Sequence, residues 1–501
     1  MSLSHASPTE HSPKRVKAAH QHPNGITGTN GTKTFPSTTS TRLAKALFSD
    51  SAIAKIWRVA ARAQGSSKPP VLYPEYTGSN GSTYVYRTLD FWTSGFFPGS
   101  LYLILERLTR YQRTSIYRSS SPSDDEDNES KILPHHLQLS YLCRWWTANL
   151  HQNALKRDTH DLGFMIAPWA MKAWDLHHDA EAYNSLVLAA HSLASRFNAT
   201  TRCIRSWDVC ITNRYSYTDV STDFLVIIDS MLNLDLLFWT AHETNNAELY
   251  DIAVAHAHTS RRHHVREDNS TAHVANFDAQ TGECKARFTN QGYSDESCWA
   301  RGQAWGILGF AQTFRWTGQS VFLDTARALA EYFISHLPED GVPYWDFMAP
   351  VTDESPRDTS AAIIAACGML VLFKSLRDTS EGEYYLREAL GIVDAAVGRF
   401  LNPPTLMFQM GRAPTQYEVY PEGCIAQGAS DGFDVLSYVD QSGSRTRDTI
   451  LDGATINNYE FAPRRWANHG LVYADYYFLL FGNMLQELGL VDMQGHINFP
   501  I

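Results

Sequence analysis

Apolar residues from about position 50 onward gather into long segments with helical spacing, and these segments alternate in character along the chain. One kind is apolar on nearly every face, which predicts a helix buried on all sides. The other kind has an apolar stripe and a charged face, which predicts a helix with one side in water. The nearly all-apolar segments are residues 91–108, 161–174, 223–240, 298–314, 359–376 and 470–488. The striped segments are residues 51–63, 136–155, 181–197, 247–264, 322–336 and 384–400.

This alternation predicts an inner ring of six buried helices wrapped by an outer ring of six half-exposed ones. Such an arrangement is an all-α (α/α)6 barrel, formed here by a single domain over residues 46–501. A barrel of this kind gathers the loops before its inner helices, and the first turns of those helices, around one central cavity. Polar residues at these places are therefore the candidates for function.

Two stretches of the chain lack apolar periodicity. Residues 1–45 are rich in Ser, Thr, Gly, Asn, Pro and His, which is typical of a disordered tail. Residues 119–131 include Ser-Ser-Pro-Ser-Asp-Asp-Glu-Asp, which predicts a solvated surface insertion. We expect neither stretch to carry chemistry.

The composition agrees with a large globular core, since 44% of the residues are apolar and 12% are aromatic. The formal net charge of −11 argues against nucleic acid or an anionic membrane as a partner. The seven cysteines are odd in number and include no C-x-x-C pair, so neither a zinc site nor a disulfide framework is indicated. No segment has the pattern of a secretory signal or a membrane span, and we expect a cytoplasmic protein with reduced thiols. The oligomeric state is left open.

Two acidic residues stand out because of their place in the apolar segments. Asp229 lies in the run from Phe224 to Leu232, well inside a segment predicted to be a buried helix. Burial raises the pKa of a carboxyl group, and a carboxyl group that keeps its proton near neutral pH can act as a general acid. Asp161 lies where another inner helix begins, so it is either a helix N-cap or a second functional carboxylate. The two acids are the candidate catalytic pair.

Aromatic and cationic residues near the starts of inner helices indicate a sugar-binding cavity. Trp92 lies at the start of the first inner segment, and Arg301 and Trp305 are four positions apart on one helical face. A guanidinium beside an indole can bind a carboxylate while the ring stacks on a sugar. Alternatively, the pair belongs to an aromatic core helix whose arginine reaches solvent.

Several common catalytic motifs are missing from the sequence. It contains no H-E-x-x-H, Walker, G-x-S-x-G or dinucleotide-binding motif. We therefore expect neither a metal nor another cofactor, and two acids in an aromatic cavity favour carbohydrate chemistry.

The stretch Cys-Trp-Ala-Arg-Gly-Gln-Ala-Trp-Gly at residues 298–306 resembles the signature of glycoside hydrolase family 88, the unsaturated glucuronyl hydrolases. Further similar pieces follow the family's order at residues 92–99, 160–164, 228–234, 291–293, 343–347 and 357–361. The resemblance extends over about residues 50–490. It implies an (α/α)6 barrel that works without a metal.

The resemblance also implies roles for individual residues. Asp229 matches the family's general acid and base, and Asp161 matches its essential partner carboxylate. The family positions that contact the unsaturated sugar or the next sugar are matched by Trp92, His273, Gln291, Arg301 and Trp305.

The implied activity is hydration of the C4=C5 double bond of a terminal 4,5-unsaturated uronic acid on a lyase-generated oligosaccharide, which releases that sugar as a keto acid. The oligosaccharide substrate is the partner we expect. Three alternatives stay open: an unsaturated rhamnogalacturonyl hydrolase of the same fold, an (α/α)6 glycosidase acting on saturated sugars, and a non-catalytic carbohydrate-binding protein. Asn290 stands where relatives often carry His, and residues 119–131 and 430–458 are unusual, so the preference among substrates stays open as well.

Overall fold

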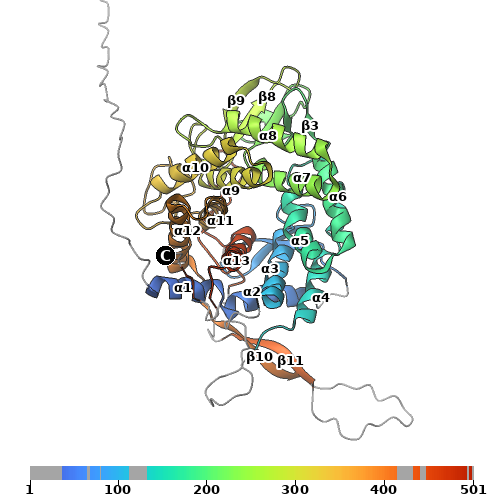
Figure 1. Ribbon diagram of the computed structural model, residues 1–501, viewed down its shortest axis with the longest axis vertical. Helices are drawn as coiled ribbons and strands as arrows, with labels where there is room; N and C mark the ends of the chain where they lie inside the picture. The colour runs from blue at the N-terminus through green and yellow to red at the C-terminus, as the bar shows by residue number, and fades with distance from the viewer. Residues whose placement is uncertain are drawn as a thin grey trace, which may run out of the picture. The chain divides into compact units, whose positions relative to one another are not determined.

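The computed structural model describes residues 37–64, 68–78, 81–111, 132–413, 433–440, 447–492 and 496–498. Over these residues two concentric rings of helices surround a common centre (Figure 1). The inner ring consists of α3 (Phe96–Arg110), α5 (Leu162–His177), α7 (Ser230–Thr244), α9 (Ala300–Thr317), α11 (Thr359–Ser375) and α13 (Val472–Glu487). The outer ring consists of α2 (Asp50–Ala63), α4 (His136–Thr147), α6 (Ala180–Ala194), α8 (Ala247–His264), α10 (Ser320–Ser335) and α12 (Ser380–Phe400). The predicted (α/α)6 barrel is confirmed.

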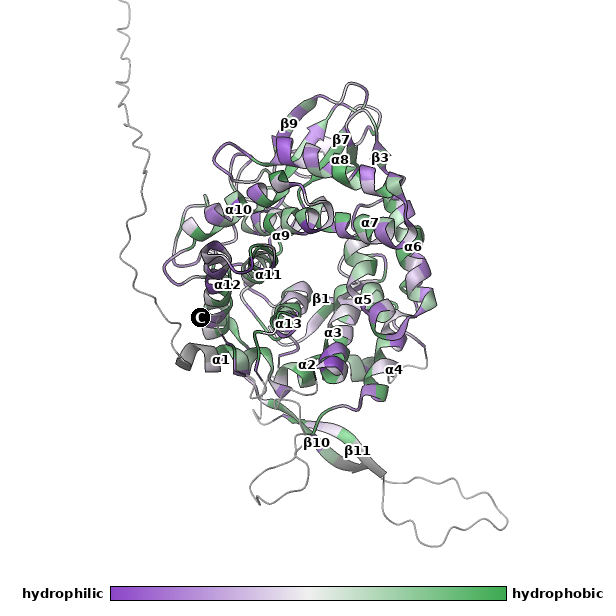
Figure 2. Ribbon diagram, viewed as in Figure 1, coloured by the Kyte–Doolittle hydropathy of each residue, from purple (hydrophilic) through white to green (hydrophobic). Residues whose placement is uncertain are grey.

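The two rings differ because their helices differ in sequence. Every residue of α11 from Thr359 to Phe373 is buried, and its side chains are small or apolar on all sides. Helix α10 instead buries one stripe, which includes Phe322, Leu329 and Phe333. Figure 2 shows the same contrast, with green along α11 and a mixture of purple and green along α8 and α10. Each large apolar side chain that the inner helices bury stabilises the fold by about 1.5–3 kcal/mol.

The barrel closes where its first and last inner helices meet, since α3 packs against α13. Arg107 on α3 is fully buried and donates hydrogen bonds to the side chain of Asn483 and to the carbonyl oxygen of Leu479, both on α13. The same guanidinium donates to the carbonyl oxygen of Leu47, 2.8 Å away, at the end of α1 (Ser37–Leu47). One buried arginine therefore joins both ends of the described chain.

Short strands connect the helices at the end of the barrel where the inner helices begin. Strands β7 (Phe224–Ile227), β8 (Val274–Phe277) and β9 (Cys284–Phe288) form an antiparallel sheet in which β8 is central. Strands β1 (Leu72–Thr77) and β2 (Tyr84–Thr88) form a hairpin. The remaining pairs are β3 (Phe197–Asn198) with β4 (Cys203–Ile204), β5 (Cys210–Ile211) with β6 (Ser216–Tyr217), and β10 (Leu406–Ala413) with β11 (Phe433–Asp440). A short 3-10 helix, η2 (His151–Leu155), follows α4.

The prediction of one continuous helix over residues 223–240 is wrong at its start. Residues Phe224–Ile227 form strand β7, and α7 begins only at Ser230. A short apolar run has the same pattern in a buried strand as in a buried helix, so periodicity cannot separate the two. The pairing of β7 with β8, about fifty residues later in the chain, decides the matter.

The folded unit also begins earlier than expected. Helix α1 starts at Ser37, and its residues Leu43 and Leu47 are buried, so the boundary predicted at residue 46 is too late. Residues 1–36 and the surface insertion predicted at 119–131 lie outside the described residues. No helix in the described part of the chain combines the length and apolar character needed to cross a membrane.

Candidate active site

A cavity of about 320 Å³ lies where the inner helices begin. Its aromatic wall consists of Phe91, Trp92, Trp207 and Trp466. Its polar wall consists of Glu75, Arg87, His160, Asp161, Asp229, Gln291 and Arg301. Flat aromatic rings beside a few convergent polar groups suit a sugar ring carrying an acidic group.

Asp229 lies deep in the barrel, directly after β7, with part of its surface open to the cavity. It occupies the N-cap position of α7, yet its side chain makes no capping hydrogen bond. Burial raises the pKa of Asp229 to about 7, the nearby charge of Arg301 lowers it in part, and the charge of Asp161 raises it further. Near neutral pH, this carboxyl group therefore carries its proton in a substantial fraction of the molecules.

Asp161 occupies the corresponding N-cap position of α5, and its side chain makes no capping hydrogen bond either. Its Oδ2 accepts a hydrogen bond from the hydroxyl of Thr159 at 2.6 Å, and its Oδ1 lies 3.2 Å from Nε2 of His160. The side chain faces the cavity that Asp229 also lines. The side chain of Asp161 therefore does not cap α5, which excludes the helix-capping alternative. Asp161 and Asp229 line the same cavity.

Arg301 supplies a fixed positive charge at the wall of this hollow. Its guanidinium pairs with Asp358 at 2.7 Å, and both side chains are almost fully buried. It also donates to the carbonyl oxygens of Thr455 and Ile456, at 2.5 and 2.6 Å. Its carbon Cζ lies 4.5 Å from the ring centroid of Trp299 and 5.5 Å from that of Tyr473, so it contacts these rings. The alternative of an arginine that reaches solvent does not hold.

Trp305 lies one turn after Arg301 on α9 and is fully buried. Its ring packs against Phe164 and Tyr477, with centroids 5.1 and 5.6 Å apart, and does not line the cavity. The indole lies close enough to Asp229 to lower the pKa of that carboxyl group, although it forms no regular hydrogen bond with it. Trp305 therefore lies beneath Asp229 and outside the cavity lining, whereas Trp92 lines the cavity.

His273 and Gln291 lie on neighbouring loops of the β7–β8–β9 sheet. The His273 ring is buried 4.6 Å from the ring of Trp299, and its Nδ1 accepts the backbone N–H of Asn290. Burial, together with the charge of Arg301, lowers the pKa of His273 to about 3, so the ring is neutral. Gln291 lines the cavity and donates to the carbonyl oxygen of Ile456 at 2.9 Å.

Asn290, the residue that departs from the family pattern, lies behind this wall. Its side chain nitrogen lies 3.0 Å from the sulfur of Cys210, and its carbonyl oxygen accepts a hydrogen bond from Asn457.

Several buried polar atoms around the cavity have no hydrogen-bond partner in the described protein. They are Asp229 Oδ1, His273 Nε2, the indole nitrogens of Trp305 and Trp466, and the hydroxyl of Tyr473. Leaving such groups unpaired costs free energy, and in folded proteins they are rare unless a ligand or water meets them. Of these residues, Asp229 and Trp466 line the cavity, so a ligand bound there can meet their unpaired atoms.

The sequence does not predict every residue of this wall. Glu75 and Arg87 face each other across the β1–β2 hairpin as an ion pair, and burial raises the pKa of Glu75. A strand signal at residues 72–88 would have placed them together. Trp207 and Trp466 lie in irregular segments, and no local pattern places them beside the acids.

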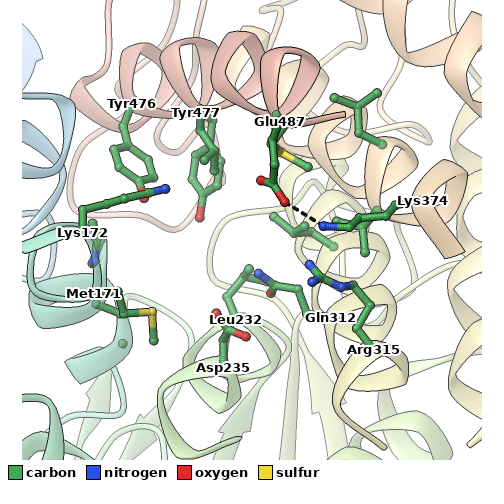
Figure 3. Close-up of a pocket in the computed structure, with 18 of the residues that line it drawn as sticks. Met171, Lys172, Leu232, Asp235, Gln312, Arg315, Lys374, Tyr476, Tyr477 and Glu487 are labelled. Atoms are coloured by element: carbon green, nitrogen blue, oxygen red, sulfur yellow. Dashed lines mark hydrogen bonds and ion pairs between the residues drawn. The ribbon is translucent and has the colours of Figure 1, made fainter. Parts of the chain in front are cut away.

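A second cavity, of about 300 Å³, lies among the later turns of five inner helices (Figure 3). Several of its charged groups have partners within the protein: Lys374 pairs with Glu487 and Lys172 with Glu106, both at 2.7 Å, and the carboxylate of Asp235 accepts the indole N–H of Trp316 at 2.6 Å. Its two acids, Asp235 and Glu487, thus each meet a partner, whereas Oδ1 of Asp229 in the first cavity meets none among the described residues. We therefore assign the active site to the first cavity. Among the described residues, no cluster of three or more His, Cys, Asp or Glu is arranged to hold a metal ion.

No family model matches the chain. The chain is 35% identical over 306 residues to the unsaturated glucuronyl hydrolase of Bacillus sp. (strain GL1), covering 61% of this chain and 73% of that protein. It is 32% identical over 300 residues to the unsaturated chondroitin disaccharide hydrolase of Streptococcus pneumoniae, covering 60% and 68%. It is 36% identical over 285 residues to an unsaturated glucuronyl hydrolase of Formosa agariphila, covering 56% and 63%. The match to this last relative thus spans less than two thirds of its length.

Solved structures agree with these relatives. The crystal structure of an unsaturated glucuronyl hydrolase specific for heparin superposes with a TM-score of 0.67 at 26% identity, covering 91% of this chain and 100% of that one. The enzyme from Bacillus sp. GL1 superposes with a TM-score of 0.65 at 25% identity, covering 88% and 96%.

Proposed function

The chain belongs to the unsaturated glucuronyl hydrolases, glycoside hydrolase family 88, and from this we propose that it removes a 4,5-unsaturated glucuronic acid from the non-reducing end of an oligosaccharide. The observation that carries the proposal is the pairing of Asp229 and Asp161 in one aromatic cavity, with the pKa of Asp229 raised to about 7. Such a carboxyl group can donate a proton near neutral pH and take one back later.

The substrate's double bond lies next to the ring oxygen, so it is an enol ether, and enol ethers react by protonation on carbon. Asp229 delivers its proton to C4, and positive charge develops at C5 and the ring oxygen. The carboxylate of Asp161 stabilises that charge. Water then adds to C5 while Asp229 takes up a proton as base, and the hemiketal that forms opens to a keto acid and frees the remaining saccharide.

The other residues of the cavity support this assignment by position. Trp92, Trp207 and Trp466 offer ring faces to the sugars. Gln291 and Arg301 lie on the polar wall, where we expect them to meet the acidic group of the unsaturated sugar. Behind this wall, Trp305 and the neutral His273 hold the acids and rings in place.

Relatives and solved neighbours are named for glucuronyl, chondroitin and heparin substrates, which favours a glucuronyl substrate over a rhamnogalacturonyl one. The test is a panel of unsaturated disaccharides of both kinds, followed by loss of the ultraviolet band of the C4=C5 bond. We expect the band to disappear with glucuronyl substrates and saturated disaccharides to stay intact. An unchanged band with every unsaturated disaccharide, or cleavage of a saturated one, contradicts the proposal.

We also propose that the protein acts in the cytoplasm and binds neither nucleic acid nor membrane. The net charge of −11 and the free thiols of the six described cysteines support this location. Cell fractionation with an antibody against the chain tests it.

A further inference from the structure

A line of buried side chains runs behind the catalytic acids, from the β7 strand to Asp161. The backbone N–H of Ile227 donates to Oγ of Ser206 at 2.9 Å. That hydroxyl lies 3.0 Å from Oγ of Ser230, which in turn lies 2.6 Å from Nδ1 of His160. The other ring nitrogen of His160 lies 3.2 Å from Oδ1 of Asp161. Both serines and the histidine are buried, so no bulk water competes for these contacts.

The protonation state of His160 follows from its surroundings. Burial lowers the pKa of His160, and the charge of Arg196 lowers it further against the opposing effect of Asp161. The ring is therefore neutral near pH 7 and carries one proton, on either Nδ1 or Nε2. The titratable or charged groups that interact with the ring are Asp161, Arg196, His256 and His273.

The donor at the start of the line decides which nitrogen holds that proton. Because Ser206 Oγ accepts from Ile227, its own hydrogen is free to point to Ser230. Ser230 could instead donate to Ser206, whose oxygen has a second lone pair, but the Ser206 hydrogen would then have no partner among these side chains. Pairing every buried donor therefore directs the Ser230 hydrogen to Nδ1 of His160 and places the ring proton on Nε2. In the opposite direction a lone pair of Nε2 would face the carboxylate at 3.2 Å, which is repulsive.

We propose that Ser206 and Ser230 are positioning residues that hold His160 in its Nε2-protonated form, with this nitrogen 3.2 Å from Oδ1 of Asp161. This inference rests on the proposed function, because Asp161 is the carboxylate that stabilises the developing positive charge. Thr159 donates to Oδ2 of Asp161 at 2.6 Å, and the dipole of the Nε2–H group beside Oδ1 helps to hold the side chain in its orientation. Ser230 follows Asp229 directly in the chain. The same turn of backbone therefore carries Asp229 and the serine that contacts His160, the neighbour of Asp161.

The kinetic test compares Ser230→Ala, Ser230→Cys and Ser206→Ala with the wild-type protein. We expect Ser230→Ala to lower kcat about fivefold to tenfold with little change in KM, since it removes one buried hydrogen bond that orients the catalytic group. Ser230→Cys retains a weak donor of similar size and should recover part of the loss. Ser192→Ala is the matched control, because Ser192 is also buried and hydrogen-bonded, to the carbonyl oxygen of Ala154, but lies on the outer helix α6.

The split between kcat and KM separates positioning from a general loss of structure. Ser230→Ala and Ser206→Ala should lower kcat while KM and the midpoint of thermal unfolding change little, because only the orientation of His160 beside Asp161 is altered. A fall in kcat that is matched by an equal loss of folded protein, or an unchanged kcat in both alanine variants, overturns the proposal.

A second readout does not depend on turnover. Nitrogen-15 NMR of histidine-labelled protein, with His160 assigned by the loss of its signals in His160→Gln, reports which ring nitrogen carries the proton. We expect the Nε2-protonated form in the wild type and a mixture of the two forms in Ser230→Ala. The Nδ1-protonated form in the wild type overturns the proposal, even if no disaccharide is turned over. Failure of the proposed function is recognised separately, because the wild-type protein then leaves every unsaturated disaccharide intact.

Discussion

Asp229 and Asp161 show how one residue type acquires two roles from its surroundings. Both occupy the N-cap position of an inner helix, and neither caps it. Asp229 lies among apolar groups with one oxygen unpaired, which favours its protonated form. Asp161 instead accepts a hydrogen bond from the hydroxyl of Thr159 and lies 3.2 Å from Nε2 of His160. Two acids in such different environments suit different roles beside a developing cation.

Replacing Asp229 with Asn should remove nearly all turnover while substrate binding persists. The amide keeps the shape of the side chain but has no proton to give, and positioned acid catalysis contributes about 10²- to 10⁴-fold. The measurement is loss of the ultraviolet band together with binding of an unsaturated disaccharide by calorimetry. Asp179→Asn is the matched control, because Asp179 is also an N-cap aspartate but caps the outer helix α6 and lies outside the cavity. A variant at position 229 that retains more than about a tenth of the wild-type rate contradicts the assignment.

The pH dependence of the reaction should follow the proton on Asp229. An acid catalyst works in its protonated form, so kcat/KM is highest below the pKa of Asp229, about 7, and falls as the pH rises through that value. The measurement is kcat/KM from about pH 5 to about pH 9 with protein shown to be folded throughout. A rate that keeps rising through neutral pH would mean that Asp229 is not the acid.

At this scale the sequence predicts some residues of the site and not others. The apolar run around Asp229 and the spacing of Arg301 and Trp305 carry local signals, and the structure places all three close together. It gives Trp305 a place beneath the acid instead of in the cavity wall, because burial on α9 is set by contacts with other helices. His273 and Gln291 carry no local signal and are found only through the family motif.

Among the elements, the connection between β7 and α7 matters most for the site, because it carries Asp229. The strand ends at Ile227 and the helix begins at Ser230, so Asp229 lies at the turn where backbone direction changes. Sequence periodicity predicts the twelve barrel helices because each is long and regular. It misses β7 and the β1–β2 hairpin because short strands are decided by pairing with distant partners.

The buried pair of Arg301 and Asp358 links helices α9 and α11, and breaking it should be costly. Asp358 caps α11 through the backbone N–H groups of Ser360 and Ala361 and also neutralises the guanidinium on α9. Asp358→Ala leaves a buried charge unpaired and should lower the free energy of unfolding by about 3–5 kcal/mol. Urea denaturation measures this.

Glu487→Ala serves as the control for Asp358→Ala, because the pair of Lys374 and Glu487 is exposed and its loss should cost no more than about 1 kcal/mol. Equal losses in the two variants would contradict the special weight given to the buried pair.

Helices α7 and α9 approach closely at Gly309. A Cβ atom at this position would lie 2.5 Å from Cβ of Met231 and 3.0 Å from its backbone carbon. Gly309→Ala should therefore lower the free energy of unfolding by about 1–3 kcal/mol through overpacking. Gly391→Ala is the matched control, since Gly391 lies inside α12 with open space around it and alanine there should stabilise the helix by about 0.5–1 kcal/mol. Thermal unfolding of the two variants should shift in opposite directions, and a shift in the same direction would refute this account of the contact.

Over the whole molecule, the double ring explains why the site is where it is. The inner helices all begin on one side of the barrel, so their N-terminal turns and the preceding loops converge on one cavity. Buried aromatic rings, among them Phe164, Trp305 and Tyr477, fill the centre beneath it. The alternation of apolar and striped helices is enough to predict this architecture from the sequence. The loops that shape the cavity are irregular, and their positions depend on contacts that no local pattern encodes.

The way the barrel closes has a consequence for its synthesis. Arg107 reaches Asn483 across 376 positions of the chain, and α13 fills the last gap in the inner ring. The ribosome synthesises α13 after all the other barrel helices, so the apolar sides of α3 and α11 that contact α13 stay exposed until it has emerged. A chain that stops short of Val472 would lack the closing segment and would be expected to aggregate instead of giving a smaller active enzyme.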